Sequence, residues 1–238
     1  MQDIRVVILA GGKGTRLKPY TTVFPKPLMP IGEMPILEVV LRQLKSFGFE
    51  NITLSVSHLA ELIQTFFGNG SKLGLNISYC IEDEPLGTAG SLSIVKNLTD
   101  TFLVMNGDLL TTLDYTAMVQ CHVNSGATAT IGAFPREVKI DFGVLEVGSE
   151  GELHTYKEKP KLEYIVSMGV NVLDKSVLDF IPHAQYLDMP TLLMKLKNAG
   201  KTVLTYHSDC EWLDIGRPSD YEEAVAAFEQ AREKYLRC

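Results

Sequence analysis

The first 106 residues alternate short apolar runs with a segment of helical period, and this order constrains the fold more than any other feature of the sequence. The apolar runs lie at residues 4–10, 51–57, 75–81 and 101–106, bounded by Gly, Asn or Asp. Between the first two, residues 35–48 repeat apolar side chains at helical spacing, with Pro at the start and Gly at the end. Nearly continuous apolar strands are typical of sheets covered by helices on both faces. We therefore expect an α/β fold with a Rossmann-like, mostly parallel sheet and right-handed crossovers.

The second half of the chain has a more mixed pattern. Short runs at residues 127–134, 142–147 and 152–158 lie close together, with Gly148 and Gly151 at their joints. This spacing predicts a small antiparallel insertion. Helical period returns at residues 188–200 and 219–236. The simplest account is one compact domain spanning residues 1–238.

Composition and charge narrow the classes of partner and compartment. The chain is 45% hydrophobic, enough for a full core, and its net charge is −7. Nucleic acids and anionic membranes are bound by broad basic surfaces, so neither is expected as a partner. No run approaches the ~20 apolar residues of a membrane span, and no signal-peptide pattern opens the chain, so we expect a cytoplasmic protein. The first thirty residues, however, carry five basic side chains and one acidic, which could receive a small anion.

The basic segment begins with a glycine-rich stretch, "LAGGKGTRL", directly behind the first apolar run. It does not match the dinucleotide fingerprint, because Leu17 stands where the third glycine should be, and it lacks the Lys-Ser or Lys-Thr of the ATPase loop. Glycines nevertheless leave backbone N–H groups open, and Lys13, Thr15 and Arg16 add charge and a hydroxyl. Since open α/β sheets bind ligands at the carboxyl ends of their strands, this composition favours a polyphosphate loop over a plain turn.

A series of motifs in this order resembles one family over almost the whole chain. The motifs are "LAGGKGTRLKPYT", "FPKPLMPIG", "EDEPLGTAG", "NGD", "FGVLEV", "EKP" and "WLDIG". Together they are similar to the sugar-nucleotide pyrophosphorylases, also called NDP-sugar nucleotidyltransferases, and "EPLGTAG" resembles the mannose-1-phosphate guanylyltransferase-like members. The resemblance implies that a nucleoside triphosphate is joined to a sugar 1-phosphate with release of pyrophosphate. It also implies a nucleotide-binding half at residues 1–110 and a sugar-phosphate-binding half at residues 111–238.

The resemblance implies a set of nucleotide-binding residues and three catalytic ones. The nucleotide-binding set is Leu9, Gly11, Gly12, Gly14, Thr15, Arg16, Lys26, Glu84 and Gly87, and the catalytic set is Arg16, Lys26 and Asp108. Arg16 can bridge phosphate oxygens with its planar fork. Lys26 stands between two prolines, which stiffen its segment and reduce the entropy lost when it is aimed at a phosphate.

The same resemblance implies a magnesium site and a sugar-phosphate site. Asp108 and Asp214 would hold Mg²⁺, which prefers a few carboxylates together with phosphate oxygens and water. The sugar-phosphate residues would be Gly143, Glu158, Lys159 and Gly169. Adjacent residues of a regular strand point to opposite faces. Either the chain twists or bulges near Pro160, so that Glu158 and Lys159 face one ligand, or one of the two acts from a distance.

The nucleobase depends on Glu84, which the resemblance places beside it. An ionised carboxylate only accepts hydrogen bonds, and guanine presents two parallel donors on one edge, so we expect GTP. Two alternatives remain: Glu84 points to solvent while backbone groups select the base, or Glu82 makes the contact. UTP-, CTP- or dTTP-dependent transfer, and a cytidylyltransferase acting on a phosphoalcohol such as phosphocholine, also stay open. The sequence fixes neither the sugar nor the oligomeric state, and a homo-oligomer is compatible with it.

Overall fold

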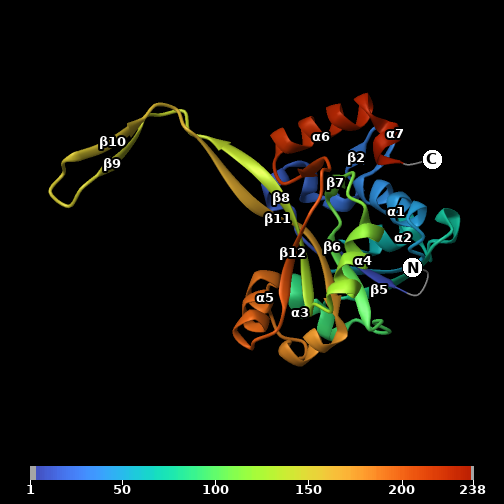
Figure 1. The fold of residues 1–238 in the computed structure, drawn as a ribbon. Helices are drawn as coiled ribbons and strands as arrows, with labels where there is room; N and C mark the ends of the chain where they lie inside the picture. The colour runs from blue at the N-terminus through green and yellow to red at the C-terminus, as the bar shows by residue number, and fades with distance from the viewer. Residues whose placement is uncertain (1–3, 237–238) are drawn as a thin grey trace.

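The protein, described over residues 4–236 by a computed structural model, is an α/β body from which a long β arm projects (Figure 1). The body is built on a seven-stranded sheet of order β12-β8-β11-β6-β1-β4-β5. Its strands are β1 (Arg5–Leu9), β4 (Asn51–Val56), β5 (Asn76–Ile81), β6 (Thr101–Asn106), β8 (Ala129–Lys139), β11 (Lys161–Asp174) and β12 (Val203–His207). The short strands are β2 (Pro30–Ile31), β3 (Met34–Pro35), β7 (Leu109–Thr111), β9 (Val144–Val147), β10 (Leu153–Lys157) and β13 (Trp212–Asp214).

The expected fold class is confirmed by the pairing of the strands. Four of the six neighbouring pairs in the sheet are parallel, and only β11 runs antiparallel to both of its neighbours. The four strands predicted in the first half are β1, β4, β5 and β6, each within two residues of its expected ends. The small antiparallel insertion is also confirmed, as the two-stranded ladder of β9 and β10.

Helices cover both faces of the sheet because its strands are apolar on both sides. Val6 and Ile8 of β1 belong to one buried cluster and Val7 to the other, as the alternation of side chains along a strand requires. The first cluster includes residues of α1 (Ile36–Ser46), α2 (Ala60–Phe67) and α4 (Tyr115–Ser125). The second includes residues of α3 (Gly87–Gly90) and α5 (Met189–Asn198). No helix within residues 4–236 is long and apolar enough to cross a membrane.

Two expectations for the second half are corrected. Residues 127–134 were assigned to the insertion, but they open β8, which lies in the main sheet between β11 and β12. The predicted C-terminal helix is two helices, α6 (Pro218–Gln230) and α7 (Arg232–Tyr235), because Ala231 leaves the helical conformation at φ −141°. These helices pack on the segment around Ile31 and Ile36 in a third buried cluster.

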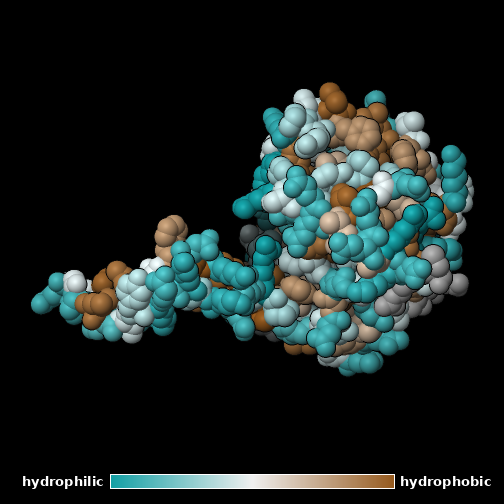
Figure 2. Space-filling view, turned by 90° about the horizontal axis from the view of Figure 1, so that it is seen from above, coloured by the Kyte–Doolittle hydropathy of each residue, from teal (hydrophilic) through white to brown (hydrophobic). Residues whose placement is uncertain are grey.

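The outer parts of β8 and β11, together with β9 and β10, form a projection that we call the arm, residues 135–167 (Figure 1). The ladder between β8 and β11 continues from Ser167 opposite Ala133 to Lys161 opposite Lys139. Side chains are mostly buried in the inner half of β8 and exposed from Pro135 outward. Figure 2 shows this projection standing clear of the body, with hydrophobic side chains among the hydrophilic ones.

Candidate active site

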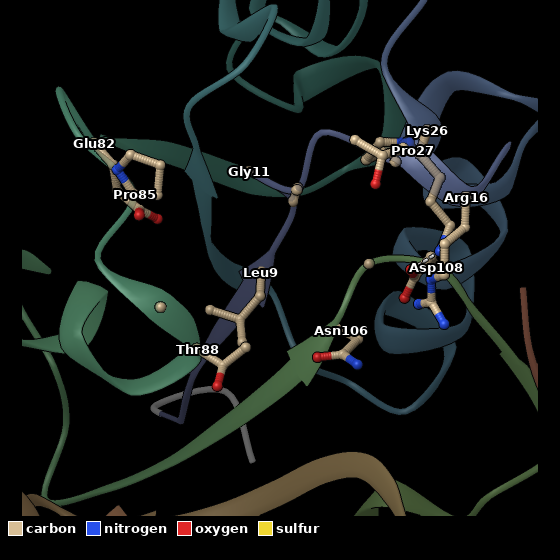
Figure 3. Close-up of a pocket in the computed structure, with 16 residues that line it drawn as sticks. Leu9, Gly11, Arg16, Lys26, Pro27, Glu82, Pro85, Thr88, Asn106 and Asp108 are labelled. Atoms are coloured by element: carbon tan, nitrogen blue, oxygen red, sulfur yellow. Dashed lines mark hydrogen bonds and ion pairs between the residues drawn. The ribbon is translucent and has the colours of Figure 1, made fainter. Parts of the chain in front are cut away.

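A cleft of about 380 Å³ opens at the carboxyl ends of β1 and β6 (Figure 3). Figure 3 shows Glu82 and Pro85 at one end of the cleft and Arg16, Lys26 and Asp108 at the other. The residues that line it are Leu9, Ala10, Gly11, Gly12, Gly14, Thr15, Arg16, Lys26, Pro27, Glu82, Pro85, Gly87, Thr88, Asn106, Gly107 and Asp108. Eight of the nine nucleotide-site candidates are among them, and Glu84 is the exception.

The glycine-rich loop follows β1 and turns back at Gly14, whose φ of +59° lies in the left-handed region. A Cβ at Gly14 would come 2.9 Å from Cγ2 of Thr21, so this close approach also requires glycine. The Thr21 hydroxyl donates a hydrogen bond of 2.7 Å to the Gly14 carbonyl and fixes the turn. A short 3-10 turn (Thr15–Leu17) follows, and its Leu17 is buried while Thr15 and Arg16 stay exposed at the cleft.

Lys26 and Asp108 form an ion pair at the end of the cleft that the glycine-rich loop borders. Lys26 begins a 3-10 turn (Lys26–Leu28) and is buried, whereas Asp108 lies just past the end of β6. Oδ2 of Asp108 accepts the hydrogen bond from the Lys26 ammonium, and Oδ1 of Asp108 is buried with no partner within residues 4–236. A buried carboxylate oxygen without a donor is costly unless a ligand satisfies it.

Asp214 is brought to the same end of the cleft by the ladder of β13 and β7, in which it pairs with Leu109. The backbone N–H of Ile215 donates to the carbonyl of Asp108 over 3.3 Å. Burial raises the pKa of the Asp214 carboxyl, and Asp108 acts in the same direction, while Lys26 and Arg16 oppose the rise. Arg16 also lies close to Gly216, two residues after Asp214: a Cβ built at Gly216 would come 3.3 Å from Nη1 of Arg16.

The two carboxylates fit a magnesium ion by number and by chemistry. Within the part of the chain that the structure describes, no group of three or more His, Cys, Asp or Glu side chains could hold a metal. Mg²⁺ needs no such group, since it is bound by one or two carboxylates with phosphate oxygens and water. The unpartnered Oδ1 of Asp108 is an oxygen donor of this kind.

At the end of the cleft where the resemblance puts the base, Glu82 is a lining residue and Glu84 is not. Oε1 of Glu82 accepts a hydrogen bond of 2.7 Å from the Ser55 hydroxyl, and Oε2 accepts one of 2.9 Å from the Leu86 N–H. These bonds fix the Glu82 carboxylate in the lining of the cleft, whereas Glu84 is exposed. The structure thus places Glu82, the alternative contact, in the lining of the cleft and leaves Glu84 outside it.

The four sugar-phosphate candidates are separated in space. Gly169 lies in the body, where three residues of β11 oppose Gly132 of β8, and its φ is +73°. A Cβ there would come 2.6 Å from Nδ2 of Asn106, a cleft residue, so Gly169 stands at the edge of the cleft. Gly143, Glu158 and Lys159 lie instead on the arm.

The arm candidates form a group of their own. Glu158 accepts a hydrogen bond of 2.9 Å from the Tyr156 hydroxyl, and Tyr156 also closes over Gly143, where a Cβ would come 2.3 Å from that hydroxyl oxygen. Lys159 has φ +42°, and no strand is formed between Lys157 and Lys161, so the chain is irregular near Pro160, as is required if Glu158 and Lys159 are to face one ligand. At ~3.3 Å per strand residue, Lys161 lies about 25 Å from Gly169 along β11.

The motifs offer Glu82 only as the alternative to Glu84, and they assign no role to six further cleft residues: Ala10, Pro27, Pro85, Thr88, Asn106 and Gly107. Each lies inside a motif that was recognised, "LAGGKGTRLKPYT", "FPKPLMPIG", "EDEPLGTAG" or "NGD". Asn106 is the last residue of β6, so its place at the carboxyl edge could have been inferred from the strand alone. The indole Nε1 of Trp212, the first residue of β13, donates a hydrogen bond of 3.0 Å to the Met168 carbonyl. This bond links β13 to the root of the arm, the part of β8 and β11 next to residues 135 and 167.

Comparisons with known proteins agree with this geometry. A UTP–glucose-1-phosphate uridylyltransferase of Synechocystis sp. is 36% identical over 242 residues, covering 93% of this chain and 62% of the relative. A mannose-1-phosphate guanylyltransferase of Mycobacterium tuberculosis is 31% identical over 231 residues, covering 94% of this chain and 64% of the relative. This chain thus spans less than two thirds of the length of both curated relatives.

A solved structure matches over nearly its full length. The crystal structure of HddC from Yersinia pseudotuberculosis complexed with GMP-PN superposes with a TM-score of 0.74 at 28% identity, covering 94% of this chain and 99% of that one. The family model described as nucleotidyl transferase matches residues 5–231. The resemblance drawn from the motifs is therefore confirmed, and the chain belongs to the nucleotidyl transferase family.

Proposed function

We propose that the protein joins a nucleoside triphosphate to a sugar 1-phosphate and releases pyrophosphate. The observation that carries this proposal is the cleft, where a glycine loop, two cations and two carboxylates converge at the carboxyl edge of the sheet. A sugar-phosphate oxygen attacks the α-phosphorus, the bond from that phosphorus to the bridging oxygen breaks, and pyrophosphate leaves. The attacking phosphate is already largely ionised at neutral pH, so the reaction needs no general base.

The chain's own residues would mainly bind and neutralise charge. The exposed N–H groups between Gly11 and Gly14 suit the triphosphate oxygens, and Arg16 can bridge two of them through its guanidinium. Lys26 is buried and paired with Asp108, so its ammonium is fixed in direction before a substrate arrives. Groups fixed in this way stabilise developing charge without reorganising during the reaction.

We assign Mg²⁺ to Asp108 and Asp214 in this mechanism. When bound, Mg²⁺ would neutralise phosphate charge and polarise the phosphoryl group. Asp108 would give it the oxygen that has no partner, and Asp214 approaches from a second strand. Residues 1–110 would then hold most of the triphosphate site, and residues 111–238 would supply the sugar-phosphate site together with Asp214.

We propose guanine as the base, with Glu82 in place of Glu84 as its partner. Glu82 lines the cleft and is oriented by Ser55 and Leu86, and a carboxylate has lone pairs left for two further donors. The mannose-1-phosphate guanylyltransferase relative and the HddC complex with GMP-PN support this choice. Uracil is the second candidate, because the uridylyltransferase relative is 36% identical.

Pyrophosphate release tests the function directly. GTP, UTP, CTP and dTTP are each offered with a panel of hexose and heptose 1-phosphates, and with phosphocholine as a phosphate that is not a sugar. We expect release that requires both a sugar 1-phosphate and Mg²⁺, with the highest kcat/KM for GTP. Release with phosphocholine alone would assign the chain to another reaction, and a preference for UTP would replace guanine by uracil.

A further inference from the structure

Three of the four sugar-phosphate candidates lie on the arm, outside the cleft of the chain that carries them. Gly143, Glu158 and Lys159 belong to the arm, whereas Gly169 borders the cleft. If the proposed function is right and these arm residues bind the sugar 1-phosphate, as the resemblance implies, they must meet a nucleotide somewhere. The structure constrains where that can happen.

The arm cannot bring Lys159 to its own cleft while its root is intact. The root is fixed in the body: Met168 is buried, its carbonyl accepts from Trp212 Nε1, and the Phe134 ring packs on the Trp212 ring with centroids 5.5 Å apart. Beyond the root the ladder is regular as far as Lys161 opposite Lys139. Lys159 lies just before the fixed ladder, which ends at Lys161, about 25 Å from Gly169 at ~3.3 Å per residue. Movement of β9 and β10 alone therefore leaves Lys159 in place.

The tip of the arm has one apolar face that nothing covers within the described chain. Directly paired residues of a ladder share a face, so Leu145 with Tyr156, and Val147 with Leu153, form one side of the β9–β10 ribbon. These four side chains are 52–60% exposed. The opposite side carries Glu146 and Lys157, which form an ion pair. A two-stranded ribbon with an open apolar face is marginal in water until another surface covers that face.

The cleft of a single chain is short of positive charge for two polyanionic substrates. Arg16 and Lys26 are the only cations among its lining residues, and Lys26 is already paired with Asp108. Lys159, by contrast, has no ion-pair partner among residues 4–236. One part of the molecule therefore lacks a cation, and another part presents one.

We propose that two copies of this chain exchange arms, so that the arm of each copy completes the sugar-phosphate site of the other. Lys159 would bind the phosphate of the sugar 1-phosphate in the second copy's cleft, and Glu158 would bind sugar hydroxyls. A twofold dimer makes both contacts at once, because an isologous interface buries the same surfaces twice. This inference rests on the proposed function for its ligand, and on the arm's geometry for the dimer.

The segment between Arg16 and Lys26, two residues that line the cleft, offers a surface of matching character. Its Tyr20 and Val23 side chains are exposed, and Phe24 lines a separate pocket with Leu62 and Phe66. The molecule therefore exposes large apolar side chains in two places, on this segment and on the tip of the arm. Exchange of arms would bury both against each other and offset the cost of exposing them.

A heterodimer of two defective chains tests the exchange. One chain carries Asp108→Asn and the other Lys159→Ala, each with its own affinity tag, and the co-expressed pair is purified through both tags. In an exchanged dimer one site combines both defects and the other combines none, so we expect about half of the wild-type activity. Each homodimer should be at least tenfold less active than wild type.

The control heterodimer and the opposing results are equally specific. Lys157→Ala replaces Lys159→Ala in the control, because Lys157 lies on the charged face next to Glu146, and the Lys157→Ala homodimer should keep wild-type activity. If the arms act on their own cleft, the test heterodimer stays as inactive as its parents, and the proposal is wrong. Full activity of the Lys159→Ala homodimer would also overturn it, since the arm would then take no part in the site.

Sedimentation measures the dimer without reference to activity. We expect the wild-type chain to be a dimer at micromolar concentration, and the double variant Leu145→Ser with Val147→Ser to be a folded monomer. Glu146→Ser, on the opposite face, should remain a dimer. A monomeric wild type, or a dimer that the apolar-face variant leaves intact, would overturn the exchange. Absence of pyrophosphate release from the wild type would instead count against the proposed function and leave this measurement standing.

Discussion

At the scale of single residues, the candidate site is a balance of charges around one buried ion pair. Lys26 neutralises one oxygen of Asp108 and leaves the other without a partner, and Asp214 approaches them from a different strand. The negative charges of Asp108 and Asp214 are tolerated near each other because the cations of Lys26 and Arg16 lie beside them. This arrangement of two carboxylates beside two cations is suited to a divalent cation together with a polyphosphate.

Removing either carboxylate charge should abolish turnover with little change of fold. Asp108→Asn and Asp214→Asn are nearly isosteric, and each removes one anionic oxygen ligand, so we expect kcat to fall by about 10² or more. Asp209→Asn, at an exposed position, is the matched control and should keep wild-type kcat. Circular dichroism verifies the fold, and near wild-type turnover in both site variants would contradict the metal assignment.

Gly14 should be the least replaceable glycine of the glycine-rich loop. Gly14→Ala places a Cβ at φ +59° and 2.9 Å from Thr21 Cγ2, so we expect a loss of about 2 kcal/mol in the free energy of unfolding and weaker triphosphate binding. Gly12→Ala is the control, because nothing lies within 4 Å of a Cβ there. Urea titrations compare the two, and equal stabilities would show that the turn is not constrained.

Glu82 should set the preference between bases. Glu82→Gln can keep the bonds to Ser55 and Leu86 but offers one donor and one acceptor, so we expect the ratio of kcat/KM for GTP over UTP to fall about tenfold or more. Glu84→Gln changes the same chemistry at an exposed position and should leave the ratio unchanged. The reverse result would restore Glu84 as the residue beside the base.

At the scale of elements, the sequence predicts the parallel strands well and the long antiparallel pair poorly. β1, β4 and β6 are short runs of buried apolar residues, so a local pattern is enough to find them. β11 is buried in its inner half and carries charged and aromatic side chains in its outer half, and no single period describes both. Its place between β6 and β8 depends on partners far away in the chain, which a local pattern does not contain.

The same limit applies to the candidate site. The motifs located the residues of the cleft because each follows a strand whose end is fixed by the sheet. They did not separate Glu82 from Glu84, since that choice depends on hydrogen bonds to Ser55 and Leu86. Nor did they show that "EKP" lies on an arm away from the cleft, because distance from the body is set by the length of the β8–β11 ladder.

The packing of α4 on β8 should make stability depend on pH through His122. This side chain is buried, and its Nδ1 lies 2.9 Å from the Thr130 hydroxyl. Burial lowers the pKa of His122 below its usual value, although Asp174 opposes the shift. The unfolded chain therefore binds the proton more readily, and the stabilisation present above a pH of ~6.5 is lost as the pH falls below it.

Chemical denaturation at several pH values measures this effect. We expect the free energy of unfolding to fall between pH 7.5 and pH 5, and the slope to be smaller in His122→Gln, which keeps a hydrogen-bonding group for Thr130 but does not titrate. His154→Gln, exposed on the arm, should retain the wild-type slope. An unchanged slope in His122→Gln would show that other groups cause the dependence.

At the scale of the whole molecule, the body and the arm are built on different principles. The three buried clusters contain no residue between 135 and 167, so the arm adds nothing to the core. We therefore expect the body to fold and hold the cleft without the arm, whereas the arm is held in place only by its ladder and by whatever covers its tip. Function is divided in the same way, with the triphosphate candidates in the body and most sugar-phosphate candidates on the arm.

Shortening the arm should therefore separate the two binding events. Replacing residues 141–159 by a short Gly-Ser turn should leave a folded body whose melting temperature still rises on addition of GTP. Pyrophosphate release with a sugar 1-phosphate should be lost. Differential scanning fluorimetry and the release assay read the two effects, and loss of the GTP-induced shift would show that the arm is needed for the nucleotide as well.

The position of Trp212 has an optical consequence. It is the sole tryptophan of the sequence, two residues before Asp214, with its indole donating to Met168 and its ring against Phe134 at the root of the arm. All indole emission of the protein thus originates at the junction of the carboxylate pair and the arm. The fluorescence emission of Trp212 should therefore change when a ligand binds at Asp214 and when the root of the arm is displaced, without any label attached to the chain.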